Sequence, residues 1–532
     1  MILSINFANK TSGMKNLLHL VWVLLLVMSV PACKLGKTAQ QTKNDGIIEV
    51  VFLHINDIYE ITPLEGGKVG GLARVATVRK NLLQNNPNTF TILAGDFLSP
   101  SLLGTIKYEG ERIRGRHIVE VLNTLGLDIA TFGNHEFDIK EDELQSRINE
   151  SEFKWTSANV YHKRGDYTMP FAKQKSGTEE LFPETMVLPV RDADGTTANI
   201  GLFGITVPYT KTDYVHYTDY FEAATKAVKE LKPKTDVIVA LTHIDVDEDK
   251  KLVGMLPDVK LAMGGHDHDN MYHKVGESIV AKADANVKTV YVHRIIINQN
   301  TKKVNVVSNL IPVNDLIPEE PQTKAIAQKW VEIGNSSFTK MGFNVNEVLA
   351  HIDPANPWDG RESTVRHKPS NLGQMIAKSM SAAFPESECA LLNSGSIRVD
   401  DQLSGDITQF DILRTLPFGG YVVGVEMKGS LLEKVLQAGL KNITKGGYLQ
   451  WDRIKPDANG NGFLVQDKPI NPNKVYFVVL PDFLLTGVET NLDFLKPDNP
   501  EIVKLHKPDA TDKSDFRNDI RQVVIEYIKK LK

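Results

Sequence analysis

The sequence predicts an α/β fold, and two observations favour that class. Apolar, β-rich runs alternate along the chain with segments whose apolar residues recur three and four positions apart, as on one face of a helix. The 532 residues are 42% hydrophobic and 24% charged, an ordinary composition for a globular protein with a sizeable core. Strands that alternate with helices indicate a layered α/β domain.

Five apolar runs are the expected strands of this domain, and each ends abruptly in a polar cluster. They are residues 49–55, 90–95, 129–133, 236–242 and 259–265. Residues 118–126 and 221–231 have helical spacing and are expected helices between them. Because ligands gather at the carboxyl ends of strands in such sheets, the polar clusters are the expected functional positions.

The pattern changes between residues 311 and 340. The proline-rich, polar stretch IPVNDLIPEEPQ is followed by TKAIAQKWVEIGN, which has the spacing of one amphipathic helix. We expect a first domain over 47–315, a helical linker over 316–341 and a second domain over 342–532. No internal repeat interrupts either domain.

The first 32 residues have the layout of a secretory signal peptide. Residues 17–30 are nearly all apolar, follow Lys15 and are too short to span a bilayer comfortably. The following VPAC resembles the lipobox of bacterial lipoproteins, which implies lipidation of Cys33, although Pro31 is unusual there. The alternative is a plain cleaved signal with an incidental cysteine. Residues 33–46 read as a polar tether, and Met14 is an alternative start.

Charge and cysteine content exclude several classes of protein. The chain has 61 Lys plus Arg against 66 Asp plus Glu, a formal charge of −5, without the sustained positive stripe that a nucleic-acid polymer would require. Its two cysteines, Cys33 and Cys389, cannot form a disulfide framework or a cysteine-based zinc module. Cys389 precedes an apolar run and is expected to be a buried small hydrophobe. We expect an exported protein on the periplasmic or outer face, lipid-anchored to a bacterial membrane, whose oligomeric state the sequence does not indicate.

The polar clusters supply the ligand types that divalent metals prefer. The carboxylates, amide and imidazoles belong to Asp57, Asp96, Asn134, His243, His266 and His268. A two-metal hydrolase needs such ligands and one anion shared between the ions. Each residue alone has an ordinary structural explanation, but the whole set at successive strand ends predicts a metal centre. The other histidines considered are assigned structural hydrogen bonds: His54, His117, His273 and His293.

The motifs NDIYEI, GDFLSP, GNHEFD, THID and GHDH, in this order, resemble those of calcineurin-like metallophosphoesterases and, more narrowly, of 5′-nucleotidases. The resemblance implies a four-layer β-sandwich flanked by helices and a second, α+β substrate-binding domain. It also implies two divalent metal ions, Zn, Mn or Co, with Fe as a further option. One ion would be held by Asp57, Asp96 and His268, and the other by Asp96, Asn134, His243 and His266. His135 would then act near the leaving oxygen, oriented by Asp138.

One position departs from the family pattern. The family usually reads Asp-x-His in the first motif, and this chain has Tyr59 at the position of that histidine. A neutral phenol with a pKa near 10 is a poor ligand for zinc or manganese. Three alternatives follow. Water replaces the ligand and the first metal site is weaker, a phenolate selects a ferric ion, or the first site is lost and catalysis is reduced.

The second domain carries the expected substrate contacts. By the same resemblance, Asn393 and Arg398 contact the substrate, and Phe418 and Phe483 sandwich the base; core packing is the alternative for both rings. The remaining implied contacts are the basic pair Arg366 and Lys368, and Glu489 for a ribose hydroxyl. Lys368 offers a point charge where an arginine would offer a bidentate fork.

These observations predict a metal-dependent hydrolase of phosphate monoesters, most simply of nucleoside 5′-monophosphates, acting by direct attack of a metal-bridging water. Neither a GxSxG elbow nor a P-loop signature is present. The alternatives are a 2′,3′-cyclic nucleotide phosphodiesterase or UDP-sugar hydrolase with the same site, and a weakly active or inactive nucleotide-binding surface lipoprotein.

Overall fold

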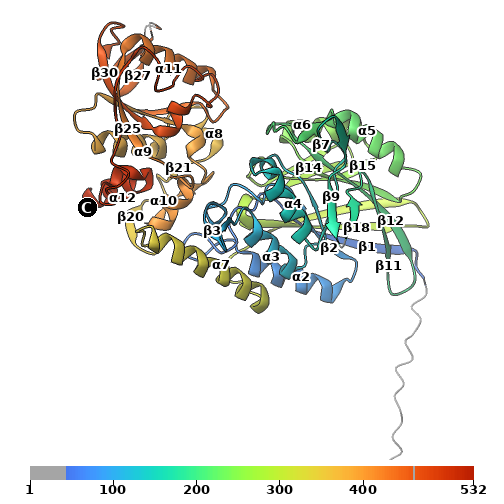
Figure 1. The fold of residues 1–532 in the computed structure, drawn as a ribbon. Coiled ribbons are helices and arrows are strands. Elements are labelled where there is room, and N and C mark those ends of the chain that lie inside the picture. Colours follow the sequence, from blue (N-terminus) through green and yellow to red (C-terminus); the bar gives the residue numbers. More distant parts are fainter. Residues whose placement is uncertain (1–43, 176, 459, 461, 532) are drawn as a thin grey trace, which may run out of the picture. The chain divides into compact units, whose positions relative to one another are not determined.

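The computed structural model describes residues 44–175, 177–458, 460 and 462–531, and its elements are labelled in Figure 1. The predicted signal peptide, Cys33 and most of the predicted tether lie outside the described residues. None of the described helices has the length and apolar character that a membrane span requires.

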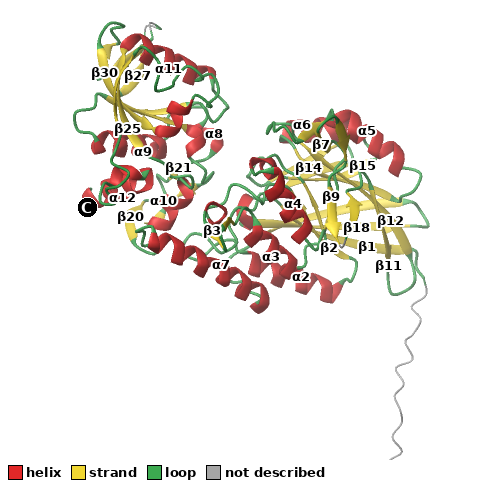
Figure 2. Cartoon of the chain, viewed as in Figure 1, coloured by secondary structure: helices red, strands yellow, loops and turns green. Residues whose placement is uncertain are grey.

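Two six-stranded sheets form the core of the N-terminal half (Figure 2). The first has the order β19 (Lys303–Pro312), β18 (Thr289–Asn298), β1 (Ile47–Ile55), β2 (Thr89–Ala94), β5 (Ile129–Thr131) and β6 (Lys154–Trp155). The second has the order β11 (Met186–Arg191), β12 (Thr197–Thr206), β14 (Val237–His243), β15 (Val259–Gly264), β17 (Ser278–Lys282) and β16 (Met271–Val275). Within the first sheet β1, β2 and β5 are parallel neighbours, and so are β14 and β15 within the second.

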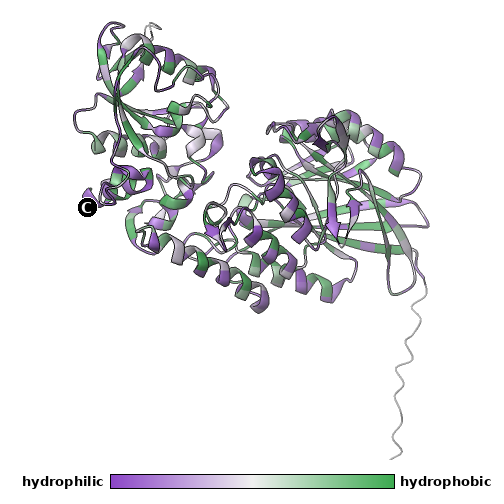
Figure 3. Ribbon diagram, in the orientation of Figure 1, coloured by the Kyte–Doolittle hydropathy of each residue, from purple (hydrophilic) through white to green (hydrophobic). Residues whose placement is uncertain are grey.

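The two sheets are stacked face to face. Successive residues of a strand point to opposite faces of its sheet, so one strand can contact two layers. In β1, Val50 and Phe52 belong to a buried cluster shared with the second sheet. The intervening Val51 and Leu53 pack instead into the cluster that contains the helices of the opposite face. Strands buried on both faces are mostly apolar, and Figure 3 shows hydrophobic stretches along the strands of this half.

Helices cover both outer faces. The described helices are α2 (Leu72–Asn85), α3 (Arg116–Leu125), α4 (Glu141–Glu150), α5 (Tyr220–Leu231), α6 (Val246–Met255), α7 (Pro321–Lys340), α8 (Glu362–Val365), α9 (Asn371–Ala383), α10 (Gln409–Thr415), α11 (Gly429–Lys441) and α12 (Ile520–Lys530). Helices α2, α3 and α4 pack against the first sheet, and α5 and α6 against the second. The layers are therefore helix, sheet, sheet and helix, which confirms the predicted α/β class and four-layer sandwich.

The expected elements are present with small shifts in their bounds. All five apolar runs are strands, namely β1, β2, β5, β14 and β15, and the two expected helices are α3 and α5. The run predicted over 129–133 is strand only to Thr131. Its last residues instead begin the turn that leads to Asn134.

A third sheet of five strands organises the C-terminal half. Its order is β26 (Leu449–Asp452), β22 (Cys389–Asn393), β30 (Val475–Pro481), β25 (Val422–Lys428) and β31 (Ile502–His506). Helix α11 packs on one face, and α9 and α12 contribute to the cluster on the other. Cys389 is fully buried in this sheet, as predicted. The domain boundaries expected from the sequence stay predictions.

The remaining strands form small accessory sheets. They are β7 (Val160–Arg164) with β8 (Tyr167–Met169) and β13 (Val215–Tyr217); β9 (Ala172–Lys175) with β10 (Thr178–Leu181); β3 (Lys107–Tyr108) with β4 (Glu111–Arg112); β20 (Val348–Ile352) with β24 (Gly405–Thr408); β21 (Trp358–Asp359) with β23 (Gln402–Leu403); and β27 (Ile454–Pro456) with β28 (Phe463–Val465) and β29 (Lys468–Pro469).

Candidate active site

The candidate metal ligands converge because they follow the carboxyl ends of parallel strands. Asp57 and Asp96 lie two residues beyond β1 and β2, and the backbone N–H of Asp57 donates to the carbonyl of Gly95 at 3.1 Å. His243 is the last residue of β14, and His266 lies two residues beyond β15. The Nδ1 atom of His243 lies 2.7 Å from the carbonyl oxygen of Ala94, which joins the edges of the two sheets.

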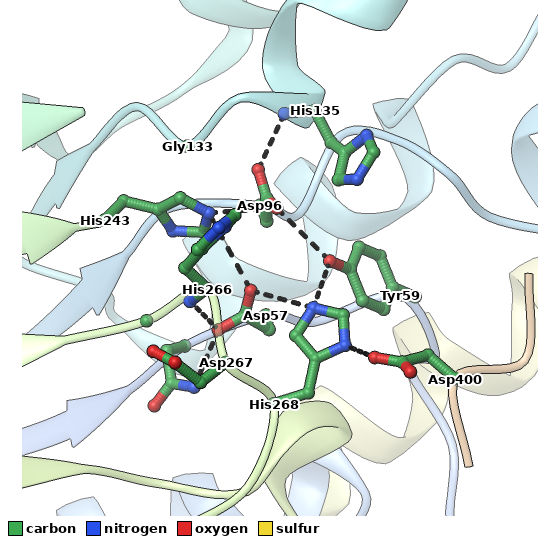
Figure 4. A network of polar contacts seen from close by, with 12 residues as sticks. Asp57, Tyr59, Asp96, Gly133, His135, His243, His266, Asp267, His268 and Asp400 are labelled. Atoms are coloured by element: carbon green, nitrogen blue, oxygen red, sulfur yellow. Dashed lines mark hydrogen bonds and ion pairs between the residues drawn. The ribbon is translucent and has the colours of Figure 1, made fainter. Parts of the chain in front are cut away.

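Four of these residues have a backbone conformation that L-amino acids rarely adopt. The φ angles are 51° at Asp57, 57° at Asp96, 84° at His266 and 64° at His268. Each such residue costs on the order of 1–3 kcal/mol, and such residues cluster at functional sites. The strained turns aim four side chains into one space, as Figure 4 shows.

The side chains form two groups that share one carboxylate. Asp96, His243 and His266 make one group and Asp57, Asp96 and His268 the other, and the ligand atoms within each group lie within 4.8 Å of one another. The Nε2 atom of His243 is 3.0 Å from Asp96 Oδ2, and that of His268 is 3.2 Å from Asp57 Oδ1. Apart from Asn134, these groups contain the same residues as the two ligand sets that the family resemblance implies. Their role as ligands stays a prediction.

The polar atoms around these groups fit a divalent cation. Asn134 Oδ1 is buried, and no hydrogen-bond partner for it lies among the described residues, so this amide oxygen can act as a ligand. Burial alone would lower the pKa of His243, but the nearby Asp96 and Asp57 raise it to about 10. That shift reflects concentrated negative charge, which a cation would neutralise.

Tyr59 points into the same space. Its hydroxyl donates to Asp96 Oδ2 at 3.3 Å and lies 3.0 Å from Nε2 of His268. Burial, together with Asp96 and Asp57, raises the pKa of Tyr59 well above its usual value of 10. The phenol is therefore held in its neutral form as a hydrogen-bond donor.

His135 and Asp138 are brought together on a single 3₁₀ turn, His135–Asp138. Nδ1 of His135 lies 2.6 Å from Asp138 Oδ2, which fixes the ring and leaves Nε2 free to face Arg398 Nη2 at 3.4 Å. The pKa of His135 is raised above its usual value. Burial alone would lower it, but the negative charges of Asp138 and Asp96 more than offset that effect. The backbone N–H of His135 also donates to Asp96 Oδ1 at 2.7 Å, so the pair is tied to the shared carboxylate.

Glu136, inside the GNHEFD motif, holds the two strand ends together. Its fully buried carboxylate accepts from the backbone N–H groups of Asp96 at 2.8 Å, Phe97 at 2.7 Å, Leu98 at 3.1 Å and Gly133 at 2.6 Å. Burial and Asp96 raise the pKa of Glu136 to about 7, against these N–H donors, which lower it. The side chain fixes the turns that present Asp96 and Asn134.

Lys282 supports the turn that carries His266 and His268. Its buried ammonium group donates to the carbonyls of Ile244 at 2.5 Å and Gly265 at 2.9 Å. It also pairs with Asp249 at 2.9 Å and with Asp267, the residue between the two histidines. Asp400, from the C-terminal half, contacts Nδ1 of His268.

Two of the basic residues expected to bind substrate meet at Glu362. This carboxylate pairs with Arg366 and lies 3.7 Å from Nη1 of Arg398. Lys368 does not join them. Its side chain is exposed, whereas its backbone N–H donates to the carbonyl of Thr364 at 3.0 Å and its carbonyl accepts from Gln450 at 2.9 Å.

The other expected substrate contacts fall into two pairs. Asn393 Nδ2 donates to Glu489 Oε2 at 3.1 Å, so these two residues are in contact; their roles in substrate binding stay predictions. Phe418 and Phe483 are 61% and 42% exposed, which argues against core packing. No contact between these two rings occurs among the ring contacts of the described residues.

Three of the four histidines set aside as structural are buried and make hydrogen bonds. His54 Nε2 lies 3.0 Å from the carbonyl of Gly264, His117 Nε2 lies 3.0 Å from the Ser101 hydroxyl, and His293 Nδ1 lies 2.7 Å from the Ser308 hydroxyl. Burial lowers the pKa of both His54 and His117 to about 3.

Sequence reasoning missed Glu136, Lys282, Glu362 and Asp400. Glu136 stands inside the GNHEFD motif, and a charged residue within that motif was the available signal; Glu362 lies four residues before Arg366, a spacing that suggests an ion pair. Lys282 gave a similar signal, because it ends an apolar strand. Asp400 gave no signal, since its contact with His268 depends on how the chain folds.

A shared carboxylate between two histidine–aspartate groups, at the edge of two stacked sheets, is the arrangement of a metal-dependent phosphoesterase. Residues 50–270 match the family model of the calcineurin-like phosphoesterases, and residues 348–496 match that of the 5′-nucleotidase C-terminal domain. The chain belongs to the calcineurin-like phosphoesterases that carry a 5′-nucleotidase C-terminal domain, and it is a hydrolase. That family uses a dinuclear divalent metal site, and this chain has candidate ligand groups for one.

Relatives match over most of the chain at low identity. The human 5′-nucleotidase is 26% identical over 510 residues, covering 83% of this chain and 84% of the relative. Protein UshA of Yersinia enterocolitica is 25% identical over 511 residues, covering 84% and 86%. The trifunctional nucleotide phosphoesterase YfkN of Bacillus subtilis is 28% identical over 438 residues, which cover 76% of this chain and 28% of that protein.

Solved structures show the same fold. A 5′-nucleotidase precursor of Thermus thermophilus superposes with a TM-score of 0.66 at 22% identity, over 91% of this chain and 97% of that one. The sulfate thiohydrolase SoxB of the same genus superposes with a TM-score of 0.62 at 14% identity, over 91% and 94%. Because these two proteins differ in substrate, the fold alone does not identify the substrate of this chain.

Proposed function

We propose that this hydrolase cleaves phosphate monoesters of nucleosides, most simply nucleoside 5′-monophosphates, to nucleoside and phosphate. The observation that carries the proposal is the position of Arg398. Its guanidinium lies 3.4 Å from His135, beside the two groups that share Asp96. A candidate phosphate-binding cation, a candidate proton donor and two candidate metal sites are thus adjacent.

The metals supply part of this chemistry. Two divalent cations held by the two groups would neutralise charge on the phosphoryl oxygens and provide an activated water. The ligands would be Asp57, Asp96 and His268 for one cation, and Asp96, Asn134, His243 and His266 for the other. Zn, Mn, Co and Fe all suit such a donor set.

The protein residues would perform the remaining steps. Asp138 holds His135 at Nδ1, so that Nε2 can donate a proton to the leaving oxygen. Arg398 would bind and orient the phosphoryl group with its planar fork. The backbone N–H of His135 donates a hydrogen bond to Asp96 Oδ1 at 2.7 Å, which fixes the position of the proton donor relative to the shared carboxylate.

Nucleoside recognition would come from the C-terminal half. Phe418 and Phe483 expose flat faces on which a base can stack, and Asn393 and Glu489 offer polar groups for the sugar or base. The neutral Tyr59 favours the alternative in which the first metal site is one ligand short and weaker. Export and lipidation at Cys33 are retained as part of the proposal, on the sequence pattern alone.

A substrate panel tests the proposal. Purified protein supplied with Mn, Zn, Co or Fe should release phosphate from AMP and p-nitrophenyl phosphate, and 2′,3′-cyclic nucleotides measure the alternative activity. Tyr59→His assayed alongside reports whether the missing imidazole limits the rate. If none of the metals supports release of phosphate from AMP or p-nitrophenyl phosphate, the proposal is wrong. Ring opening of 2′,3′-cyclic nucleotides to nucleoside monophosphates would then support the phosphodiesterase alternative, and turnover of none of these esters would support a binding protein.

A further inference from the structure

Glu362 places a carboxylate against both arginines of the candidate phosphate site. It is the first residue of the short helix α8, Glu362–Val365. Its Oε1 atom pairs with Nη2 of Arg366 and lies 3.7 Å from Nη1 of Arg398. The sequence assigned no role to this residue.

A local helical pairing explains only part of this arrangement. Glu362 and Arg366 are four residues apart, a spacing at which oppositely charged side chains commonly pair. Arg398, however, follows a different strand, β22, and still approaches the same carboxylate oxygen. The carboxylate therefore sits between two guanidinium groups from separate segments.

The charge of Glu362 also reaches the catalytic residues. Burial alone would raise the pKa of Glu362, but Arg366 and Arg398, with His135 and His268, outweigh it and lower the pKa, so the group is ionised at neutral pH. The same negative charge contributes to the raised pKa of Tyr59. Because its carboxylate lies 3.7 Å from Nη1 of Arg398, Glu362 would be close to any phosphoryl group that Arg398 binds.

Two guanidinium groups with one carboxylate leave a single net positive charge where two would otherwise face the substrate. A phosphate monoester is a dianion above a pKa of about 6, whereas a phosphodiester is a monoanion. Repulsion from a fixed negative charge in a partly buried site grows with the charge of the ligand. The dianion is therefore penalised more than the monoanion.

We propose that Glu362 is a specificity-determining residue that reduces the preference of this site for the dianionic phosphate monoester over the monoanionic phosphodiester. This inference rests on the proposed function, because it concerns substrates of the same site. It assigns to one side chain the balance between the monoesterase and diesterase activities.

The test compares two substrates with the same leaving group and different charge. The values of kcat/KM for p-nitrophenyl phosphate and bis-p-nitrophenyl phosphate are measured at pH 7.5 with the same metal, in the wild type and in Glu362→Gln. The monoester-to-diester ratio should rise about tenfold in Glu362→Gln. Glu388→Gln is the matched control, because Glu388 pairs with Lys474 in the same half of the chain, and its ratio should not change.

Three further results complete the test. An unchanged ratio in Glu362→Gln and in Glu362→Ala, with melting temperatures equal to the wild type, overturns the inference while leaving the proposed function intact. If the wild type hydrolyses neither ester, the proposed function fails, and the affinity for inorganic phosphate decides the role of Glu362. Tighter phosphate binding by about tenfold in Glu362→Gln then supports the role, and equal binding refutes it.

Discussion

Replacing Glu136 by glutamine should destabilise the N-terminal half strongly although the two side chains have the same shape. The buried carboxylate accepts four backbone hydrogen bonds, two at each oxygen. Glutamine retains one oxygen, and its amide NH₂ must face two N–H donors. Two hydrogen bonds to a charged acceptor are then lost and their donors remain buried.

The size of the effect follows from those contacts. A hydrogen bond to a charged group contributes about 1.5–3 kcal/mol, so two lost bonds cost about 3–6 kcal/mol. For a domain of this size, 1 kcal/mol corresponds to a shift of about 2–4 °C in the melting temperature. We therefore expect the melting temperature of the N-terminal half to fall by about 6–24 °C in Glu136→Gln.

Differential scanning calorimetry at pH 9, where Glu136 with its pKa of about 7 is ionised, measures this shift, and excess EDTA removes any contribution from bound metal. Glu152→Gln is the control, because Glu152 is exposed and its side chain supports no strand end. It should melt within about 1 °C of the wild type. If Glu136→Gln also melts within about 2 °C of the wild type, the four hydrogen bonds of Glu136 do not stabilise the N-terminal half as calculated.

Three other substitutions test separate features. Lys282→Met leaves buried carboxylates unpaired and should lower the free energy of unfolding by about 3–5 kcal/mol. Adding Asp249→Asn should recover part of that loss. An unchanged free energy of unfolding in Lys282→Met would contradict this prediction. Tyr59→His adds an imidazole ligand and should tighten binding of the more weakly held Mn or Zn ion by about tenfold in calorimetric titration, whereas unchanged binding would show that position 59 does not reach the metal. The pKa of His117 is lowered by burial from 6.5 to about 3, so the unfolded chain binds the proton more tightly and stability is lost as pH falls below 6.5. His117→Leu should therefore lose about 2 kcal/mol less stability than the wild type between pH 7 and 5, and parallel curves would refute the assignment.

Much of the fold could be predicted from the sequence because its signals are local. The strands β1, β2, β14 and β15 are apolar on both faces, and each ends at a polar residue that terminates the pattern. The pairing of these strands into two stacked sheets is non-local. It depends on alternate residues such as Phe52 and Leu53 facing different layers, which a doubly apolar strand does not reveal.

The candidate site divides in the same way. Asp57, Asp96, His243, His266 and His268 could be proposed because each stands at a strand end, and the structure brings all five together. Their roles as ligands still await a metal measurement. Contacts that depend on distant segments could not be read from spacing. The second-domain residues show this most clearly, since Lys368 faces solvent and Glu362 lies between Arg366 and Arg398.

The dinuclear site is tested most directly by metal content and turnover measured on the same samples of wild type and Asp96→Asn. After dialysis against Mn, the wild type should hold two ions per chain, because two ligand groups share Asp96, and should hydrolyse p-nitrophenyl phosphate. Asp96→Asn should bind less metal and retain below about 1% of the rate. Wild-type metal content and an unchanged rate in Asp96→Asn would contradict a catalytic site built on a shared carboxylate.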